Sequence, residues 1–148
     1  MHKLLYTTTI IFMTFGCTEV AVVDKPAGPP VIEYVDIQPR IVKEFQDSIL
    51  ITFKYADPDG DLGYENPDLR PLGIHDLRLQ KSDFQHIGLL APIDAHVDVS
   101  GELTVKLKNT FLLGSSDQEI TTYELIFTDR AGNTSNPIQT DEISIIRR

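Results

Sequence analysis

The stretch ILITFKYADPDGDLG, residues 49–63, joins an alternating apolar run to an acidic loop. Every second residue from Ile49 to Tyr55 is apolar, and a period of two is typical of a β-strand with one buried face. Pro58 and Gly60 follow and predict a turn at the end of the strand. The stretch therefore predicts a strand that leads into a loop rich in carboxylates.

The same alternation recurs along the chain and predicts an all-β domain. Seven short strands are expected, at residues 31–39, 49–55, 74–80, 96–100, 103–109, 122–129 and 142–146. Clusters of Gly, Pro, Asn and Asp separate them, as in antiparallel sheets. Sustained helical periodicity is absent from the sequence, and residues 82–90 are expected to form at most one helical turn. Seven antiparallel strands within residues 31–148 predict a sandwich of two packed sheets.

The N-terminal segment MHKLLYTTTIIFMTFGC has the features of a targeting signal. Lys3 precedes an apolar run at residues 4–15, which is too short to span the roughly 30 Å core of a membrane but suits a signal peptide. With Gly16 directly before Cys17, the segment resembles a bacterial lipoprotein signal. The resemblance implies that residues 1–16 are removed and that Cys17 becomes a lipid-carrying N-terminus.

The positions three and two before the cysteine hold Thr14 and Phe15, where lipoprotein signals usually have Leu and a small residue. The alternative is a plain secretory signal that leaves Cys17 as a free thiol. Residues 17–30 are expected to be the lipidated cysteine and a tether, because three prolines in this segment exclude a helix. Two or more acyl chains would hold the protein on a membrane without a spanning helix.

Charge and cysteine content narrow the possible partners. The 148 residues carry a formal net charge of −9. This charge argues against nucleic acid as a partner, because binding phosphates needs clustered Lys and Arg. Cys17 is the only cysteine, so no disulfide can form within the chain.

Two parts of the sequence resemble a known family. FTDRAGNTSNP, residues 127–137, is similar to the C-terminal hairpin of many bacterial immunoglobulin-like modules. PPVIEYVDIQP, residues 29–39, followed by residues 49–63, resembles the first strands of small immunoglobulin-like lipoproteins of Gram-negative bacteria. The resemblance implies an immunoglobulin-like or fibronectin type III-like β-sandwich in the cell envelope, lipid-anchored in the outer membrane. It implies no particular activity.

The acidic loop predicts a calcium site. Ca²⁺ takes six to eight oxygen ligands, and Asp side chains at alternate positions of a turn can supply several of them. Counted from Asp57 as in an EF-hand loop, the candidate ligands are Asp57, Asp59, Asp61, Glu65 and Asp68. The loop is not a true EF-hand, because its glycine stands at position 4 and nearby prolines exclude the flanking helices.

A second acidic position is expected beside this loop. In a sandwich of this kind, the loops after strands 49–55 and 122–129 lie at the same end. Asp129, together with Asn133, is therefore expected to complete the calcium site. The alternative is that Asp-Pro-Asp-Gly, residues 57–60, is a turn that binds nothing, since Pro and Gly stand where a type I turn favours them.

Common catalytic motifs are absent from the sequence, which has no G-x-S-x-G elbow, no H-E-x-x-H and no glycine-rich phosphate loop. We therefore expect a protein that is not an enzyme and that has a structural role or recognises a protein or glycan. The alternative is a carbohydrate-binding or accessory module of a surface hydrolase or uptake system. The absence of Trp weighs against it, because sugar rings stack on aromatic side chains. A small catalytic domain would need a pocket with perturbed carboxylates.

Overall fold

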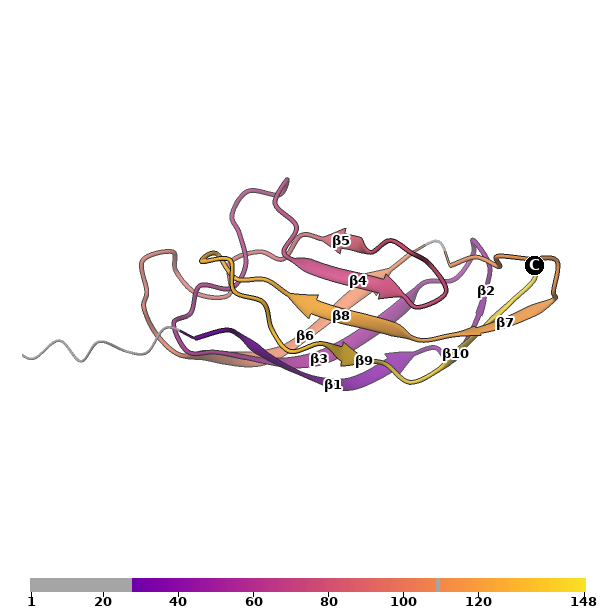
Figure 1. Cartoon of the computed structure of the whole chain (residues 1–148), viewed down its shortest axis with the longest axis horizontal. Helices are drawn as coiled ribbons and strands as arrows, with labels where there is room; N and C mark the ends of the chain where they lie inside the picture. The colour runs from indigo at the N-terminus through magenta and orange to yellow at the C-terminus, as the bar shows by residue number, and fades with distance from the viewer. Residues whose placement is uncertain (1–27, 109) are drawn as a thin grey trace, which may run out of the picture.

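The computed structural model describes residues 28–108 and 110–148, and this part of the chain consists of strands and loops without a helix (Figure 1). Accordingly, no helix in the described part could cross a membrane. The predicted signal peptide, Cys17 and most of the predicted tether lie outside the described residues. The strands are β1 (Val31–Gln38), β2 (Ile41–Lys43), β3 (Ile49–Asp57), β4 (Leu72–Asp76), β5 (Asp83–Gln85), β6 (Val99–Leu107), β7 (Gln118–Thr121), β8 (Tyr123–Phe127), β9 (Ile138–Gln139) and β10 (Ile143–Ile146).

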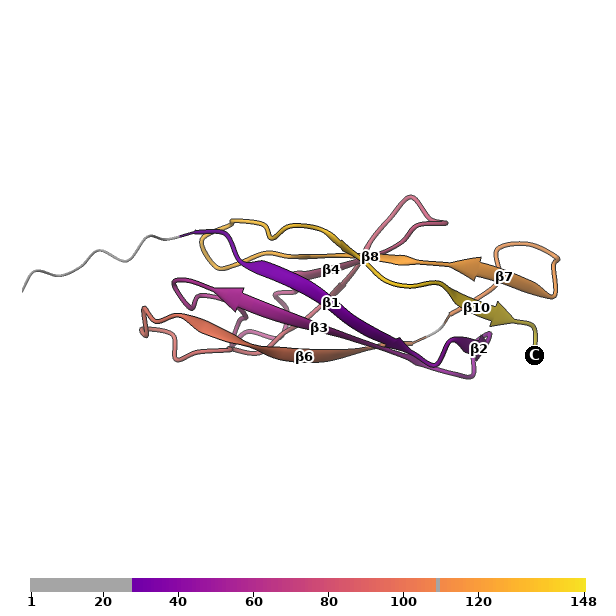
Figure 2. The same ribbon diagram turned by 90° about the horizontal axis from the view of Figure 1, so that it is seen from below.

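These strands form three sheets arranged in two layers. One sheet has the antiparallel order β1-β3-β6 and another the antiparallel order β5-β4-β8-β9. The third has the order β2-β10-β7, in which β2 runs parallel to β10. Only Thr122 separates β7 from β8, so the chain passes directly between these two sheets. Figure 2 shows β1, β3 and β6 in one layer and β4, β8, β7 and β10 in the other, an arrangement compatible with a β-sandwich.

The core lies between the two layers and is built from the alternating residues of their strands. Ile51 and Phe53 on β3 are fully buried, as are Leu125 and Phe127 on β8. The rings of Phe53 and Phe127 meet edge to face, with centroids 6.4 Å apart and planes at 84°. Fully burying a side chain of this size contributes ~1.5–3 kcal/mol to folding. These contacts therefore hold the middle of the two layers together.

The prediction of separate strands at residues 96–100 and 103–109 is wrong, because β6 runs as one strand through this region. Its register with β3 is continuous across Gly101. A Cβ at this glycine would stand 2.8 Å from the hydroxyl oxygen of Tyr55. The Tyr55 ring thus covers the gap that glycine leaves, and the strand continues where the apolar alternation is interrupted.

The next two segments of the chain, residues 74–80 and 82–90, contain a shorter strand than predicted and an additional strand. The strand predicted at residues 74–80 ends at Asp76, whose carboxylate accepts hydrogen bonds from the backbone N and the guanidinium of Arg78. These bonds close a turn that stops the strand. Residues 82–90, expected to form at most one helical turn, contain no helix, because β5 forms there and pairs with β4.

The described residues form ten strands in three sheets, rather than seven strands in two. The additional strands β2, β5, β7 and β9 have between two and four residues each. Segments of that length are too short to show an alternation, so their pairing with longer strands decides their conformation.

Candidate metal centre

The acidic loop leaves the end of β3 and is held in place at two glycines. Gly60 and Gly63 have φ angles of +72° and +83°, in the left-handed region that favours glycine. A Cβ on Gly60 would stand 2.3 Å from the carbonyl oxygen of Val97, and a Cβ on Gly63 would stand 2.1 Å from that of Gly88. Between the two glycines, Leu62 is fully buried in the core. The backbone here therefore packs closely against neighbouring segments.

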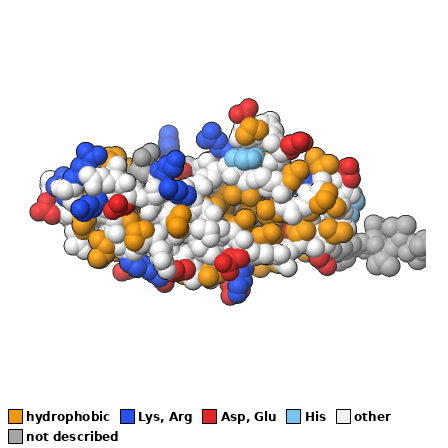
Figure 3. Space-filling view, turned by 180° about the vertical axis from the view of Figure 1, so that it is seen from behind, with side chains coloured by type: hydrophobic (Ala, Val, Ile, Leu, Met, Phe, Trp, Pro, Cys, Tyr) orange, Lys and Arg blue, Asp and Glu red, His pale blue; other side chains and the backbone are white. Residues whose placement is uncertain are grey.

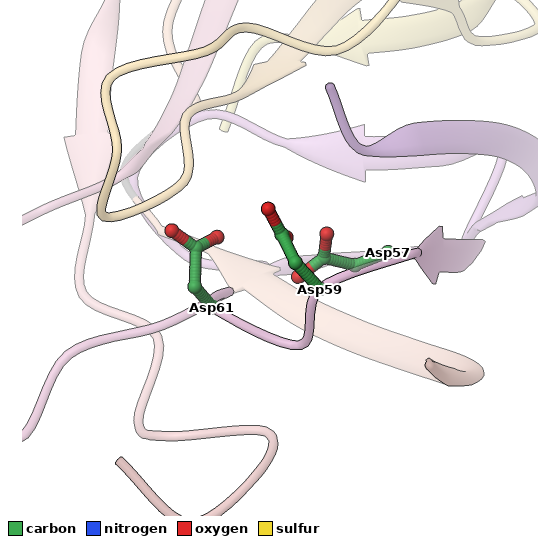
Figure 4. Close-up of side chains that lie close together, drawn as sticks. All are labelled: Asp57, Asp59 and Asp61. Atoms are coloured by element: carbon green, nitrogen blue, oxygen red, sulfur yellow. The ribbon is translucent and has the colours of Figure 1, made fainter. Parts of the chain in front are cut away.

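The loop brings Asp57, Asp59 and Asp61 together, and we call these residues the acidic cluster. Each offers one oxygen, and the three oxygens lie within 4.8 Å of one another. Figure 4 shows the three side chains projecting to the same side of the loop. Asp57 is only 1% exposed, and the Oδ1 atom of each residue is buried and accepts no hydrogen bond from the described residues. Buried acceptors without a donor are costly unless a ligand satisfies them.

Backbone N–H groups hold the other oxygens of two of these carboxylates. Leu62 N donates to Asp57 Oδ2 at 3.0 Å. Ala131 N, from the loop after β8, donates to Asp61 Oδ2 at 2.9 Å. The Asp57 and Asp61 side chains are thus positioned by the fold, while their Oδ1 atoms remain available to a ligand.

Burial and mutual repulsion both disfavour the ionised carboxylates of the acidic cluster. Burial and the neighbouring Asp59 raise the pKa of Asp57 to about 6. The pKa of Asp61 is also raised, by burial and by the charges of Asp129 and Asp59. The nearby Arg130 guanidinium offsets only part of that shift. A divalent cation among the oxygens would favour the charged forms and reverse these shifts.

The loop after β8 lies against the acidic loop, as the topology expected from the sequence requires. Arg130 N donates to the backbone oxygen of Asp61 at 3.2 Å, and Tyr64 Oη donates to that of Asp129 at 3.2 Å. Asp129 is fully buried, and Asn133 donates to both of its carboxylate oxygens, at 2.7 and 2.9 Å. Asp129 therefore lies beside the acidic cluster, with its carboxylate turned to Asn133.

The structure does not bring Glu65 and Asp68 to the acidic cluster. Both are exposed, and Asp68 N donates to Asn66 Oδ1 at 2.9 Å within a local turn. The EF-hand numbering that selected them presumes flanking helices, whereas this loop follows a strand. The backbone N–H groups of Leu62 and Ala131, which position the cluster, could not be identified from the sequence. Every residue except proline carries such a donor, so nothing distinguishes these two.

The oxygens of the acidic cluster are close enough together to hold a metal ion, and their spacing is compatible with Ca²⁺. Calcium–oxygen distances of 2.3–2.6 Å allow two ligand oxygens of one ion to stand at most about 5 Å apart. The separation of up to 4.8 Å within the cluster agrees with this limit. Three carboxylates would leave further positions for carbonyl oxygens or water, as is common around calcium.

A separate surface feature lies on the outer face of the β1-β3-β6 sheet. A mainly apolar hollow of about 510 Å³ opens there, and its lining includes Val31, Glu33, Lys54, Ala56 and Glu102. On the face seen in Figure 3, hydrophobic side chains gather toward the end at which β1 begins, and Lys and Arg gather toward the C-terminal end. The two ends of this face therefore differ in chemistry.

Comparison of the chain with protein-family models, with curated proteins and with solved structures found no match. The acidic cluster and the surfaces of the two layers are therefore the basis for inferring function.

Proposed function

We propose that this chain is a lipoprotein of the cell envelope, held in the outer membrane of a Gram-negative bacterium through Cys17. It presents a non-catalytic, immunoglobulin-like β-sandwich that calcium stabilises and that has a structural role or recognises a protein or glycan. The observation that carries the calcium part is the group of buried Oδ1 atoms of Asp57, Asp59 and Asp61, which accept no hydrogen bond from the described residues. An ion there would connect the end of β3 to the loop after β8 through Asp61.

The strand order supports the immunoglobulin-like assignment. In sandwiches of this class, strands A, B and E lie in one sheet and strands C, F and G in the other. By order in the chain, β1, β3 and β6 correspond to A, B and E, and β4, β8 and β9 correspond to C, F and G. The disulfide and Trp typical of antibody domains are absent from the sequence, so the assignment depends on topology.

Thermal unfolding of the full chain in detergent, with millimolar calcium and then with a chelator, tests the calcium site. A ligand at 100 times its dissociation constant adds about 2.7 kcal/mol to the free energy of unfolding. For a domain of this size, the midpoint is then expected to rise by several degrees. Asp59→Ala and Asp61→Asn are expected to abolish the rise, because the first removes a ligand carboxylate and the second removes the negative charge of another.

Glu65→Gln and Asp68→Asn are the matched controls, since both remove an exposed carboxylate from the same loop. Both variants are expected to keep the full calcium-dependent rise. Identical wild-type curves in calcium and chelator would refute the calcium site. The acidic cluster would then be a turn stabilised by the amides of Leu62 and Ala131 alone.

One observation favours the alternative function, a carbohydrate-binding or accessory module of a surface hydrolase or uptake system. Phe84 on β5 is 58% exposed, so an aromatic ring is available on the surface for a sugar to stack on. The exposed Phe84 ring weakens the argument that a chain without Trp cannot stack a sugar ring.

A further inference from the structure

Phe84 lies at the centre of a surface on the outer face of the β5-β4-β8-β9 sheet. It stands opposite Gly73 on β4, which in turn stands opposite Ile126 on β8. A Cβ on Gly73 would be 3.4 Å from the Phe84 ring, so the ring lies closely over this glycine. A large part of the ring nevertheless remains open to solvent.

Two hollows adjoin the Phe84 ring and carry polar groups. The smaller, of about 150 Å³, includes His75, Ser82 and Glu124 in its lining. The larger, of about 260 Å³, includes Tyr64, Arg70 and Pro71. Phe84 and Thr128 line both hollows. An apolar ring bordered by hydroxyl, carboxylate and guanidinium groups can contact the C–H face of a sugar and bond to its hydroxyl groups.

The acidic loop and the loop after β8 also build the larger hollow. Tyr64 follows Asp61 by three residues and donates from its hydroxyl to the backbone oxygen of Asp129. Thr128 N donates to the backbone oxygen of Pro71 at 3.0 Å. An ion that restrains these two loops would therefore fix the walls of the hollow before a ligand arrives, which lowers the entropic cost of binding.

We propose that the surface centred on Phe84 binds a neutral glycan and that calcium in the acidic cluster strengthens this binding. A neutral ligand fits because the lining supplies one carboxylate, Glu124, and one guanidinium, Arg70. The glycan site itself does not require the proposed calcium site, whereas its calcium dependence rests on it. The competing explanation is that Phe84 only covers Gly73 and stabilises the sheet.

Affinity electrophoresis of the full chain in detergent tests the proposal, with gels that contain soluble β-glucan, xylan, mannan or starch. At least one of these polysaccharides is expected to retard the wild-type chain in calcium. Phe84→Ala is expected to weaken the binding about tenfold or more, because it removes the stacking ring. Phe45→Ala is the matched control. Phe45 is similarly exposed, at 56%, but it lies just after β2, which belongs to the β2-β10-β7 sheet.

Three further measurements separate the two proposals. Phe84→Ala should keep the calcium-dependent rise in thermal midpoint, and Glu124→Gln should weaken glycan binding in a folded chain. Asp59→Ala, or chelator, should weaken glycan binding severalfold, because the walls of the larger hollow would no longer be fixed before the glycan binds. Circular dichroism confirms that each variant is folded.

The proposal is overturned if none of the four polysaccharides retards the wild-type chain, or if Phe84→Ala and Phe45→Ala bind alike. Calcium-dependent stabilisation without glycan binding would overturn the glycan site and leave the calcium site standing. Phe84-dependent binding that is equal in calcium and in chelator would overturn the calcium coupling alone.

Discussion

Asp57 ends β3 with one carboxylate oxygen accepting a hydrogen bond from Leu62 N and the other without a donor. Because the residue is almost fully buried, its negative charge is poorly solvated. A proton or a metal ion can relieve this charge, and the two compete for the same carboxylate. Protonation of Asp57 would therefore oppose the proposed binding of calcium.

In chelator, the free energy of unfolding is expected to fall as the pH rises from about 4 to about 6. The pKa of Asp57 is about 6 in the folded chain, and an unfolded Asp has a pKa of about 3.9. Between these values the folded state binds more protons, so a rising pH favours unfolding. The Asp57 carboxyl therefore stabilises the folded chain most below about pH 4, and this stabilisation is lost as the pH rises through about 6.

Urea unfolding at several pH values measures this contribution as the difference between wild type and Asp57→Asn, which cannot ionise in this range. Parallel profiles for the two proteins would show that Asp57 titrates normally in the folded chain. With calcium present, the stabilisation by the ion should grow as the pH rises, since the ion binds the ionised carboxylates.

The segment between β3 and β4 combines three tasks in one loop. It carries the acidic cluster, it buries Leu62 in the core, and its later residues line the larger hollow beside Phe84. Gly63 lies between the first and third of these parts and approaches the backbone of Gly88 closely. The path of the loop at Gly63 therefore affects both candidate sites.

Gly63→Ala is expected to lower the free energy of unfolding by roughly 2–5 kcal/mol. A left-handed φ costs an alanine roughly 1–2 kcal/mol, and the clash with the Gly88 backbone adds ~1–3 kcal/mol. Gly132→Ala is the control, because Gly132 has a φ of +89° but no atom within 4 Å of the added Cβ. Urea denaturation measures both losses. Equal losses would show that the close approach to Gly88 is unimportant.

The longer strands could be predicted from the sequence, and of the strands with two to four residues only β10 could. β3 and β8 alternate over nine and five residues, because burying one face of a strand imposes a period of two. β9 has two residues and is a strand because it pairs with β8, a contact that no local pattern records. The break in alternation at Gly101 was misleading, since the residue that compensates for it, Tyr55, lies on another strand.

The acidic cluster was predictable for a similar reason. Three Asp residues at alternate positions of one turn are local, and their spacing alone brings Asp57, Asp59 and Asp61 together. The orientation of Asp129 was not predictable, because it depends on two hydrogen bonds from Asn133. Metal binding itself stays a prediction.

The described chain begins at the end of the molecule that carries the acidic cluster. A Cβ on Gly28 would stand 3.8 Å from the Pro58 ring, and the C-terminus lies at the opposite end (Figure 1). In the proposed anchored protein, the chain leading from Cys17 therefore enters the domain beside the acidic cluster. The end of the domain that carries the C-terminus then lies farther from the lipid anchor.

Cys17→Ser is expected to move the protein from the membrane fraction to the soluble fraction of bacterial cells. The reason is that stable anchoring needs two or more acyl chains, which the lipidated cysteine would carry. Fractionation and mass spectrometry of the N-terminal peptide measure the change, with Asp59→Ala as a variant that should stay in the membrane. An unmodified Cys17 thiol in the wild-type protein would contradict the anchor.

The parallel pairing of β2 with β10 has a mechanical consequence. β1 begins at one end of the molecule and the C-terminus lies at the other, so a force that pulls these ends apart acts along the strands. The hydrogen bonds between β2 and β10 are then loaded in shear and must break together, whereas a hairpin opened from its end loses its bonds one at a time. The direction of one three-residue strand is thus expected to make the domain resist stretching between its ends.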